Sequence, residues 1–177
     1  MNYLSEPKEG WVIPVSIDLS EAEKQFFDSE MRTMLEKLAP DQPLPDINAT
    51  SVRGEWQGSG ASLLSTPTTK EEFAHFLGTM KDSPVILCLH GGGYITGSAA
   101  MERTATFRLC RASDARVFAV DYRLAPQHPF PAALLDALVA YKYLVDPPSD
   151  ALHEKIDSRR IVIAGDSCGV FSILLRY

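Results

Sequence analysis

The fold is decided by residues 161–169, which read IVIAGDSCG. The first four residues are a short apolar run that favours a buried β-strand. The pentapeptide GDSCG, residues 165–169, follows at once and fits the pattern G-x-S-x-G. After a strand, this pattern is typical of a turn so sharp that the serine takes a strained backbone conformation and presents its hydroxyl outward. We therefore interpret Ser167 as a nucleophile, although these nine residues alone also fit a glycine-containing turn with an incidental serine.

A second glycine-rich segment, His90-Gly91-Gly92-Gly93, follows the apolar run 85–89. In acyl transfer the attacked carbonyl becomes an oxyanion, and backbone N–H groups on a loop without side chains can approach and stabilise it. A loop that cradles phosphate would be expected to contain G-x-x-x-x-G-K-[ST] or G-x-G-x-x-G, and the chain contains neither. The segment is therefore interpreted as an oxyanion loop rather than a phosphate-binding loop.

The runs 85–89, 117–120 and 161–164 are short, apolar and separated by segments of helical length. Alternation of this kind predicts parallel strands joined by right-handed crossovers. We expect a three-layer α/β sandwich with a mainly parallel sheet and a ligand site at the carboxyl ends of its strands. A helix is predicted after Pro131, with one apolar stripe formed by Leu134, Leu138, Tyr141 and Val145.

The N-terminal part is predicted to hold one amphipathic helix over residues 21–38. Ser20-Glu21-Ala22-Glu23 fits a capping box, and Phe27, Met31, Met34 and Leu38 recur at helical spacing. Pro40 ends the helix and begins a proline-rich connector. We divide the chain into a segment 1–48, with the helix and connector, and a core segment 49–177.

Two antiparallel edge strands are predicted at the start of the core segment, Val52–Trp56 and Ala61–Leu64. Gly58-Ser59-Gly60 would form the turn between them.

The composition is that of an ordinary soluble domain, with 45% hydrophobic and 23% charged residues in 177. A net charge of -6 without any basic block argues against nucleic acid or an anionic membrane surface as a partner. The apolar runs are far shorter than the roughly 20 residues that span a bilayer, and residues 1–15 lack the apolar centre of a signal peptide. The sequence thus predicts a cytoplasmic protein without a transmembrane segment.

Cys88, Cys110 and Cys168 are odd in number, widely spaced and set among apolar residues, which favours free thiols over disulfides. No Cys or His pair has the spacing that zinc sites need, and the predicted chemistry requires no cofactor or metal. Cys168 lacks a cationic neighbour in sequence to stabilise a thiolate, so we expect it to pack like a small apolar residue.

Four segments of the chain form an ordered set of motifs: His90-Gly91-Gly92-Gly93-Tyr94, Asp121-Tyr122-Arg123-Leu124-Ala125-Pro126, Pro129-Phe130-Pro131-Ala132-Ala133 and Gly165-Asp166-Ser167-Cys168-Gly169. This set resembles the hormone-sensitive-lipase family of α/β-hydrolases over about residues 83–169. The resemblance implies an oxyanion hole formed by the N–H groups of Gly92, Gly93 and Cys168, with Gly91 shaping the loop. It also implies an N-terminal helical cap over the site, a role open to the helix 21–38, which could instead simply pack on the core.

The remaining polar residues of these motifs are expected to be structural. A short polar turn ending in proline, such as 121–126, more often locks a strand exit than touches a substrate, and Asp121 and Arg123 are expected to pair. His75, His90, His128 and His153 are each expected to be structural or solvated, and none is nominated as the catalytic base.

The order of the catalytic triad in this fold is Ser, then Asp or Glu, then His, but no acidic residue and no histidine follows Ser167. The resemblance stops at Gly169, and Val170 departs from it. We expect an incomplete part of an enzyme that hydrolyses small carboxylic esters through an acyl-enzyme on Ser167, inactive on its own. The alternative is a ligand-binding protein without catalytic activity on the same scaffold. The chain also resembles the plant gibberellin receptors, which share the fold of this family without its full triad.

Overall fold

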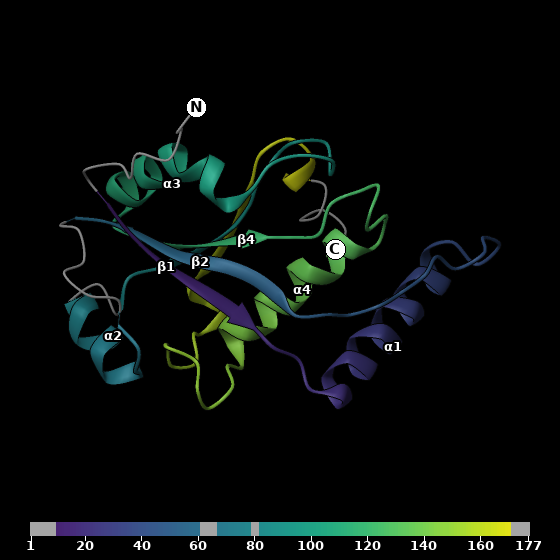
Figure 1. The fold of residues 1–177 in the computed structure, drawn as a ribbon, viewed down its shortest axis with the longest axis horizontal. Helices are drawn as coiled ribbons and strands as arrows, with labels where there is room; N and C mark the ends of the chain where they lie inside the picture. The colour runs from purple at the N-terminus through teal and green to yellow at the C-terminus, as the bar shows by residue number, and fades with distance from the viewer. Residues whose placement is uncertain (1–9, 61–66, 79–81, 171–177) are drawn as a thin grey trace.

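A five-stranded sheet organises the residues that the computed structural model describes, 10–60, 67–78 and 82–170 (Figure 1). The strands are β1 (Gly10–Ile17), β2 (Val52–Ser59), β3 (Val85–Leu89), β4 (Arg116–Asp121) and β5 (Ile161–Gly165). They lie in the order β1-β2-β4-β3-β5. The three strands predicted from the apolar runs are confirmed as β3, β4 and β5.

The sheet is mixed rather than mainly parallel within the described residues. β4 pairs with β3 and β3 pairs with β5 in parallel, whereas β1 with β2 and β2 with β4 run antiparallel. The difference has two sources: β1, which was not predicted, adds an antiparallel strand beside β2, and β2 itself runs antiparallel to β4. Its buried residues Trp11, Ile13 and Ile17 follow the alternation expected of a strand with one buried face.

β2 confirms the predicted strand that begins at Val52, but its expected surroundings were wrong. It lies between β1 and β4 rather than at the edge, and it continues to Ser59 through the expected turn. Gly58 is needed inside the strand because the Trp11 ring of β1 occupies the space that a Cβ would fill. The expected partner strand 61–64 lies outside the described residues.

Helices cover both faces of the sheet (Figure 1). α3 (Ala99–Ser113) packs on one face over a small cluster that contains Cys110, Val117 and Ala119. The other face carries the main core, to which α1 (Glu21–Leu38), α2 (Lys70–Leu77) and α4 (Ala132–Val145) all contribute buried side chains. The predicted three-layer α/β arrangement is therefore confirmed.

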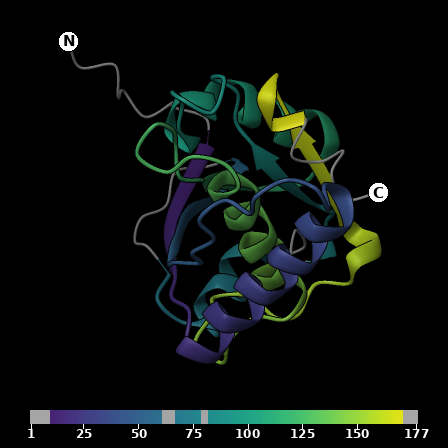
Figure 2. The same ribbon diagram turned by 90° about the vertical axis from the view of Figure 1, so that its right-hand side faces the viewer.

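α1 has the predicted bounds and the predicted capping box. Glu23 N donates to Ser20 Oγ over 3.3 Å, and Ser20 N donates to the Glu23 carboxylate over 3.0 Å. The helix lies alongside α4 (Figure 2), where Glu23 forms an ion pair of 3.7 Å with Lys142. The helix therefore packs on the core, which was one of the two roles considered for it. That it also covers the site stays a prediction. The division of the chain at residue 48 stays a prediction as well, although β1, from the first segment, pairs with β2 of the core.

α4 follows Pro131 as predicted, but its buried face is not the predicted stripe. Leu134 is buried, whereas Leu138, Tyr141 and Val145 are only half-buried. Burial extends instead around most of the helix because it lies between α1 and the sheet; the buried residues include Leu135, Ala137, Val139, Ala140, Tyr143 and Leu144.

Candidate active site

Two neighbouring parallel strands bring the glycine loop and the serine turn to the same edge of the sheet. β3 and β5 pair with Leu89 opposite Gly165, so residues 90–93 and 166–168 leave the sheet side by side. Asp166 N also donates to the Leu89 carbonyl oxygen over 3.3 Å. The candidate residues thus lie at the carboxyl ends of the parallel strands, the place at which a ligand site was predicted.

The serine turn has the backbone strain that its pattern predicts. Ser167 is exposed and has a φ of +49°, in the left-handed region that side chains rarely adopt, and a helix begins at Cys168. A Cβ on Gly169 would collide with the Leu89 carbonyl, and a Cβ on Gly165 would lie 2.8 Å from the Gly169 carbonyl carbon. Both glycines are required because the turn packs directly against the end of β3. Among the described residues, the Ser167 hydroxyl has no hydrogen-bond partner.

The glycine loop is held in a tight turn that requires glycine at its centre. The Gly92 carbonyl accepts hydrogen bonds from Ile95 N and Thr96 N, both at 3.1 Å. Gly92 has a φ of +115°, and a Cβ there would collide with the Thr96 carbonyl oxygen. Gly93 also has a positive φ, +63°, but a Cβ there would meet open space.

Gly92 and Gly93 are exposed, and Cys168 at the serine turn is buried. The N–H groups of Gly92, Gly93 and Cys168 donate to no other group within the described part of the chain. Gly91 approaches the Asp166 carboxylate so closely that a Cβ would collide with it, which agrees with a role in shaping the loop. The two loops therefore present three backbone amides beside an exposed, strained serine.

Two tyrosines for which no role was predicted connect the glycine loop to the serine turn. Tyr94 donates from its hydroxyl to the Cys168 carbonyl over 2.7 Å, and its N–H lies 3.3 Å from Cys168 Sγ. Tyr122 donates to the His90 carbonyl over 2.5 Å and stacks on the His90 ring with centroids 4.0 Å apart. Burial raises the pKa of Tyr122, so its hydroxyl stays protonated and remains a donor. The sequence signal that could have identified them is their position: Tyr94 ends the glycine-loop motif and Tyr122 lies in the motif that follows β4.

Cys168 packs in the way expected of a small apolar side chain. It is buried, and its Sγ lies 3.6 Å from the Tyr122 hydroxyl. All three cysteines are free, and burial raises the pKa of both Cys88 and Cys110 to about 11. These two thiols stay protonated near neutral pH and are poor nucleophiles.

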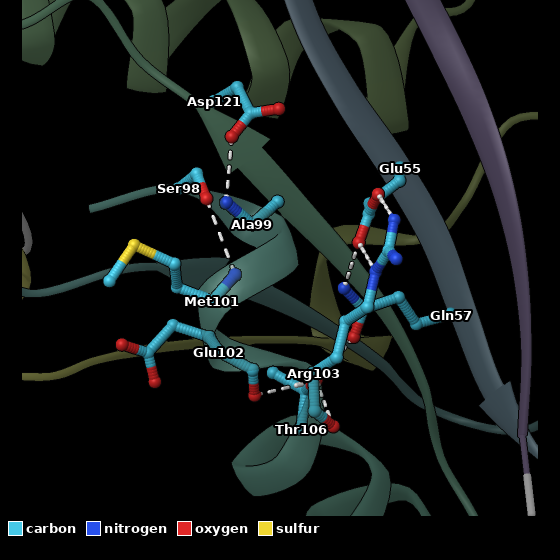
Figure 3. A network of polar contacts seen from close by, with 9 residues as sticks. All are labelled: Glu55, Gln57, Ser98, Ala99, Met101, Glu102, Arg103, Thr106 and Asp121. Carbon is cyan, nitrogen blue, oxygen red and sulfur yellow. Dashed lines mark hydrogen bonds and ion pairs between the residues drawn. The ribbon is translucent and has the colours of Figure 1, made fainter. Parts of the chain in front are cut away.

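The segment after β4 makes structural contacts, but the predicted pair of Asp121 and Arg123 does not form. Asp121 accepts a hydrogen bond of 2.7 Å from Ala99 N at the start of α3 (Figure 3). Arg123 instead binds the buried Asp136 carboxylate of α4 through its backbone N–H and its guanidinium, at 2.7 to 3.0 Å. The reason is electrostatic. The N-terminus of α3 carries a partial positive charge that favours the Asp121 carboxylate, and the buried Asp136 carboxylate needs a cationic partner, which Arg123 supplies.

α3 is held to the sheet by a buried polar network (Figure 3). Arg103 donates two hydrogen bonds, of 2.8 and 2.7 Å, to the Glu55 carboxylate of β2. Gln57 donates to Glu55 over 2.6 Å and accepts from Thr106. Because Ser98 and Asp121 fix the start of the same helix, the network also positions the end of the glycine loop.

None of the four histidines forms a hydrogen bond with Ser167 within the described residues. His90 is buried against Tyr122, and its Nδ1 lies 2.7 Å from the Gly91 carbonyl oxygen. His75 and His128 are exposed, and His128 lines a cavity beside Gly93. His153 is buried against the rings of Trp56 and Tyr143, which agrees with a structural role.

His153 gives the folded chain a predicted sensitivity to acid. Burial lowers its pKa to about 4, with smaller contributions from Arg116 and Lys70, whereas an unfolded histidine titrates near 6.5. Between these pH values only the unfolded chain binds the proton, so stability is complete above about pH 6.5 and is lost as the pH falls toward 4. We expect a loss of about 3 kcal/mol in the free energy of unfolding from this group.

Urea unfolding of the wild type and of His153→Gln in phosphate-free buffer measures this effect. The stability difference between the two proteins is expected to shrink by about 3 kcal/mol from pH 7 to pH 4, because glutamine does not titrate. An unchanged difference would show that the ring is not held neutral.

Among the helices of the described residues, none is both long and apolar enough to cross a membrane. The same residues contain no cluster of three or more His, Cys, Asp or Glu side chains placed to hold a metal ion.

Comparison with known proteins gives consistent matches. Residues 86–170 match a family model described as the alpha/beta hydrolase fold. Ethyl acetate hydrolase of Pseudomonas putida is 34% identical over 161 residues, which are 90% of this chain and 46% of that protein. Esterase LipI of Mycobacterium tuberculosis is 39% identical over 133 residues, 73% of this chain and 38% of that protein.

A solved structure of an esterase from the bacterial hormone-sensitive lipase family matches with a TM-score of 0.51 at 29% identity. The match covers 85% of this chain and 42% of that one. The chain thus spans less than half the length of the relatives it matches. With its layered sheet, its glycine loop and its strained serine turn, the chain belongs to the hormone-sensitive-lipase family of α/β-hydrolases.

Proposed function

We propose that this chain carries the nucleophile, Ser167, and the oxyanion-binding amides of a serine hydrolase that acts on carboxylic esters. The observation that carries the proposal is the strained Ser167, exposed at the carboxyl end of β5 beside three backbone N–H groups without partners. The printed names of the similar proteins, ethyl acetate hydrolase and esterase LipI, support this reaction class.

In the proposed reaction, Ser167 Oγ attacks the ester carbonyl carbon while a base removes its proton. The carbonyl oxygen becomes an oxyanion and accepts hydrogen bonds from the N–H groups of Gly92, Gly93 and Cys168. Collapse of this intermediate breaks the bond to the alcohol oxygen, which leaves with the proton, and the acyl group remains on Ser167. Water then attacks the acyl-enzyme, so that the products are a carboxylic acid and the regenerated serine.

The base in this fold is a histidine that follows the serine in the chain and is oriented by an acidic residue. We propose that both are contributed by sequence outside this chain, because the chain spans less than half the length of ethyl acetate hydrolase and esterase LipI.

A cavity of about 460 Å³ beside the glycine loop would receive part of the ester. It is lined by Gly93, Tyr94 and Ile95 of the loop and, across from them, by the exposed Phe130 and by Leu134. Apolar walls with few polar groups suit the acyl or alcohol group of a small ester.

The proposal is tested in a graft that joins residues 1–169 to the C-terminal half of ethyl acetate hydrolase, a relative that matches 90% of this chain. Hydrolysis of p-nitrophenyl acetate by the folded graft supports an enzyme. Saturable binding of an ester analogue without turnover would instead support the ligand-binding alternative.

Gly92→Ala is expected to lower kcat of the graft by about 10²- to 10³-fold, the usual cost of losing one oxyanion donor. The new Cβ would collide with the Thr96 carbonyl and displace the loop, even though the N–H itself is retained. Gly78→Ala is the matched control, because Gly78 also has a positive φ, +51°, and its Cβ would meet open space at the end of α2, so kcat should change by less than about tenfold. Equal kcat values for Gly92→Ala and the wild-type graft would remove the loop from the oxyanion site.

A further inference from the structure

A cavity of about 400 Å³ lies at the edge of the sheet opposite the serine turn. Arg116 lines it from the first position of β4, opposite Val85 at the first position of β3. The glycine loop follows the other end of β3, roughly 16 Å away at the usual rise of a strand. The start of α2 and the segment 152–156 complete the walls, so this cavity is separate from the proposed active site.

Arg116 is a buried cation that has no carboxylate partner among the described residues. Only 4% of its surface is exposed, its guanidinium lies 5.4 Å from the centre of the Trp56 ring, and its Nε has no hydrogen bond. No carboxylate of the described residues lies within 4.0 Å of it. Burial, and next the nearby Arg160, lower its pKa to about 10, so it remains charged at neutral pH. An unpaired buried charge is costly, and a bound anion would compensate it.

The charged side chains that line the cavity include one more cation than carboxylates. Lys70 pairs with Glu154 at 3.5 Å, and Arg160 pairs with Asp82 at 3.9 Å. Four cationic side chains, including Lys155, thus face three carboxylates, including Glu71, in the lining. The cavity is locally positive in a protein whose net charge is -6.

His153 adds an acceptor to the same cavity. It is 4% exposed and, like Arg116, contacts the Trp56 ring. Its Nε2 lies 3.1 Å from the Tyr143 carbonyl oxygen, which requires the proton on Nε2 in the neutral ring. Nδ1 is then an acceptor, and it is buried without a partner. Arg116 and His153 therefore bring guanidinium donors and one unused acceptor to the lining of the cavity.

We propose that this cavity binds a hydrogen-phosphate group, with Arg116 donating to its charged oxygens and His153 Nδ1 accepting from its hydroxyl. An oxyanion that carries a hydroxyl satisfies both buried residues at once, whereas sulfate can satisfy only the arginine. The group can come from inorganic phosphate or from a phosphomonoester. Both fit the chemistry, and the cavity is large enough for a small organic substituent.

Equilibrium dialysis of the 177-residue chain against labelled inorganic phosphate tests the proposal, because it tolerates any state of association. We expect saturable binding at one site per chain, and about tenfold weaker competition by sulfate than by unlabelled phosphate, for loss of one buried hydrogen bond. Glycerol phosphate is the second competitor: stronger competition than phosphate identifies a phosphomonoester site, and weaker competition identifies a site for the free ion. Absence of saturable binding up to about 10 mM phosphate overturns the proposal. Equal competition by sulfate overturns the role of His153.

Two arginine variants separate a specific site from a general effect of charge. Arg116→Met keeps the length and apolar stem of the side chain and should weaken phosphate binding about tenfold or more. Arg159→Met is the control, because the Arg159 side chain is 87% exposed and pairs with Asp157. It should leave the dissociation constant unchanged.

Thermal unfolding in phosphate and in chloride of equal ionic strength provides an independent readout if Arg116→Met folds poorly. Phosphate should raise the Tm of the wild type and of Arg159→Met, but not of Arg116→Met, because a ligand of the folded state stabilises it. Arg116→Lys, which keeps the charge, should retain part of the shift. The same rise in Tm for every variant would mean a general salt effect and would overturn the site.

Discussion

Ser167→Ala is expected to abolish ester hydrolysis by the graft, with kcat falling about 10⁴- to 10⁶-fold. Alanine removes the only atom that can form the acyl-enzyme, while the oxyanion amides and the cavity keep their places. The remaining rate should be the slow turnover that binding and the oxyanion site give without a nucleophile. Initial rates with p-nitrophenyl acetate measure the effect.

Ser98→Ala is the matched control for this substitution, because Ser98 lies at the end of the glycine loop but points to α3. Its hydroxyl accepts a hydrogen bond of 3.3 Å from Met101 N at the helix N-terminus. Losing this cap should cost about 1 kcal/mol of stability and change kcat by less than about tenfold. Turnover that survives Ser167→Ala at the wild-type rate would assign the chemistry to another residue.

The 177-residue chain alone is expected to hydrolyse the same ester at least about 10³-fold more slowly than the graft. Ser167 has no hydrogen-bond partner among the described residues. His90 stacks on Tyr122, and His153 lies at the opposite edge of the sheet. Without a base to take its proton, the serine keeps an ordinary hydroxyl. Parallel assays of the chain and the graft at equal concentration measure the ratio.

The same chain is also expected to self-associate, for a reason independent of catalysis. β5 lies at one end of the described sheet, and its Val162 is 55% exposed. An apolar strand with an unpaired edge can pair with another chain. Sedimentation should show that the 177-residue chain associates and that the graft does not. A monomeric chain with the turnover of the graft would contradict both expectations and would assign the base to His75 or His128.

The strands that carry the site were predictable from the sequence because they are fully apolar and short. Val85–Leu89 and Ile161–Ala164 contain no polar residue and are each followed by glycine motifs. β1 was not predicted, although Trp11, Ile13 and Ile17 alternate, because Pro14 interrupts the pattern. In addition, β2, the strand with which β1 pairs, follows only after α1 in the sequence. Proline is compatible with this position only because β1 is at an edge.

Within the site, local patterns predicted what lies on one loop and failed for contacts between loops. The strain at Ser167 and the need for Gly165 follow from the pentapeptide itself. The partner of Arg123 could not be read from its neighbour Asp121, because the buried Asp136 lies on a helix that only the tertiary fold brings close. The link from Tyr94 to Cys168 likewise depends on the pairing of β3 with β5.

Labelling the graft with a fluorophosphonate, followed by mass spectrometry of the modified peptide, identifies the nucleophile and so tests the assignment of Ser167. A serine activated by a base attacks the phosphorus and releases fluoride, which leaves a stable adduct on its oxygen. We expect one adduct per chain, on the peptide that contains Ser167, and none on Ser167→Ala. An adduct on a different serine, or equal labelling of Ser167→Ala, would contradict the account.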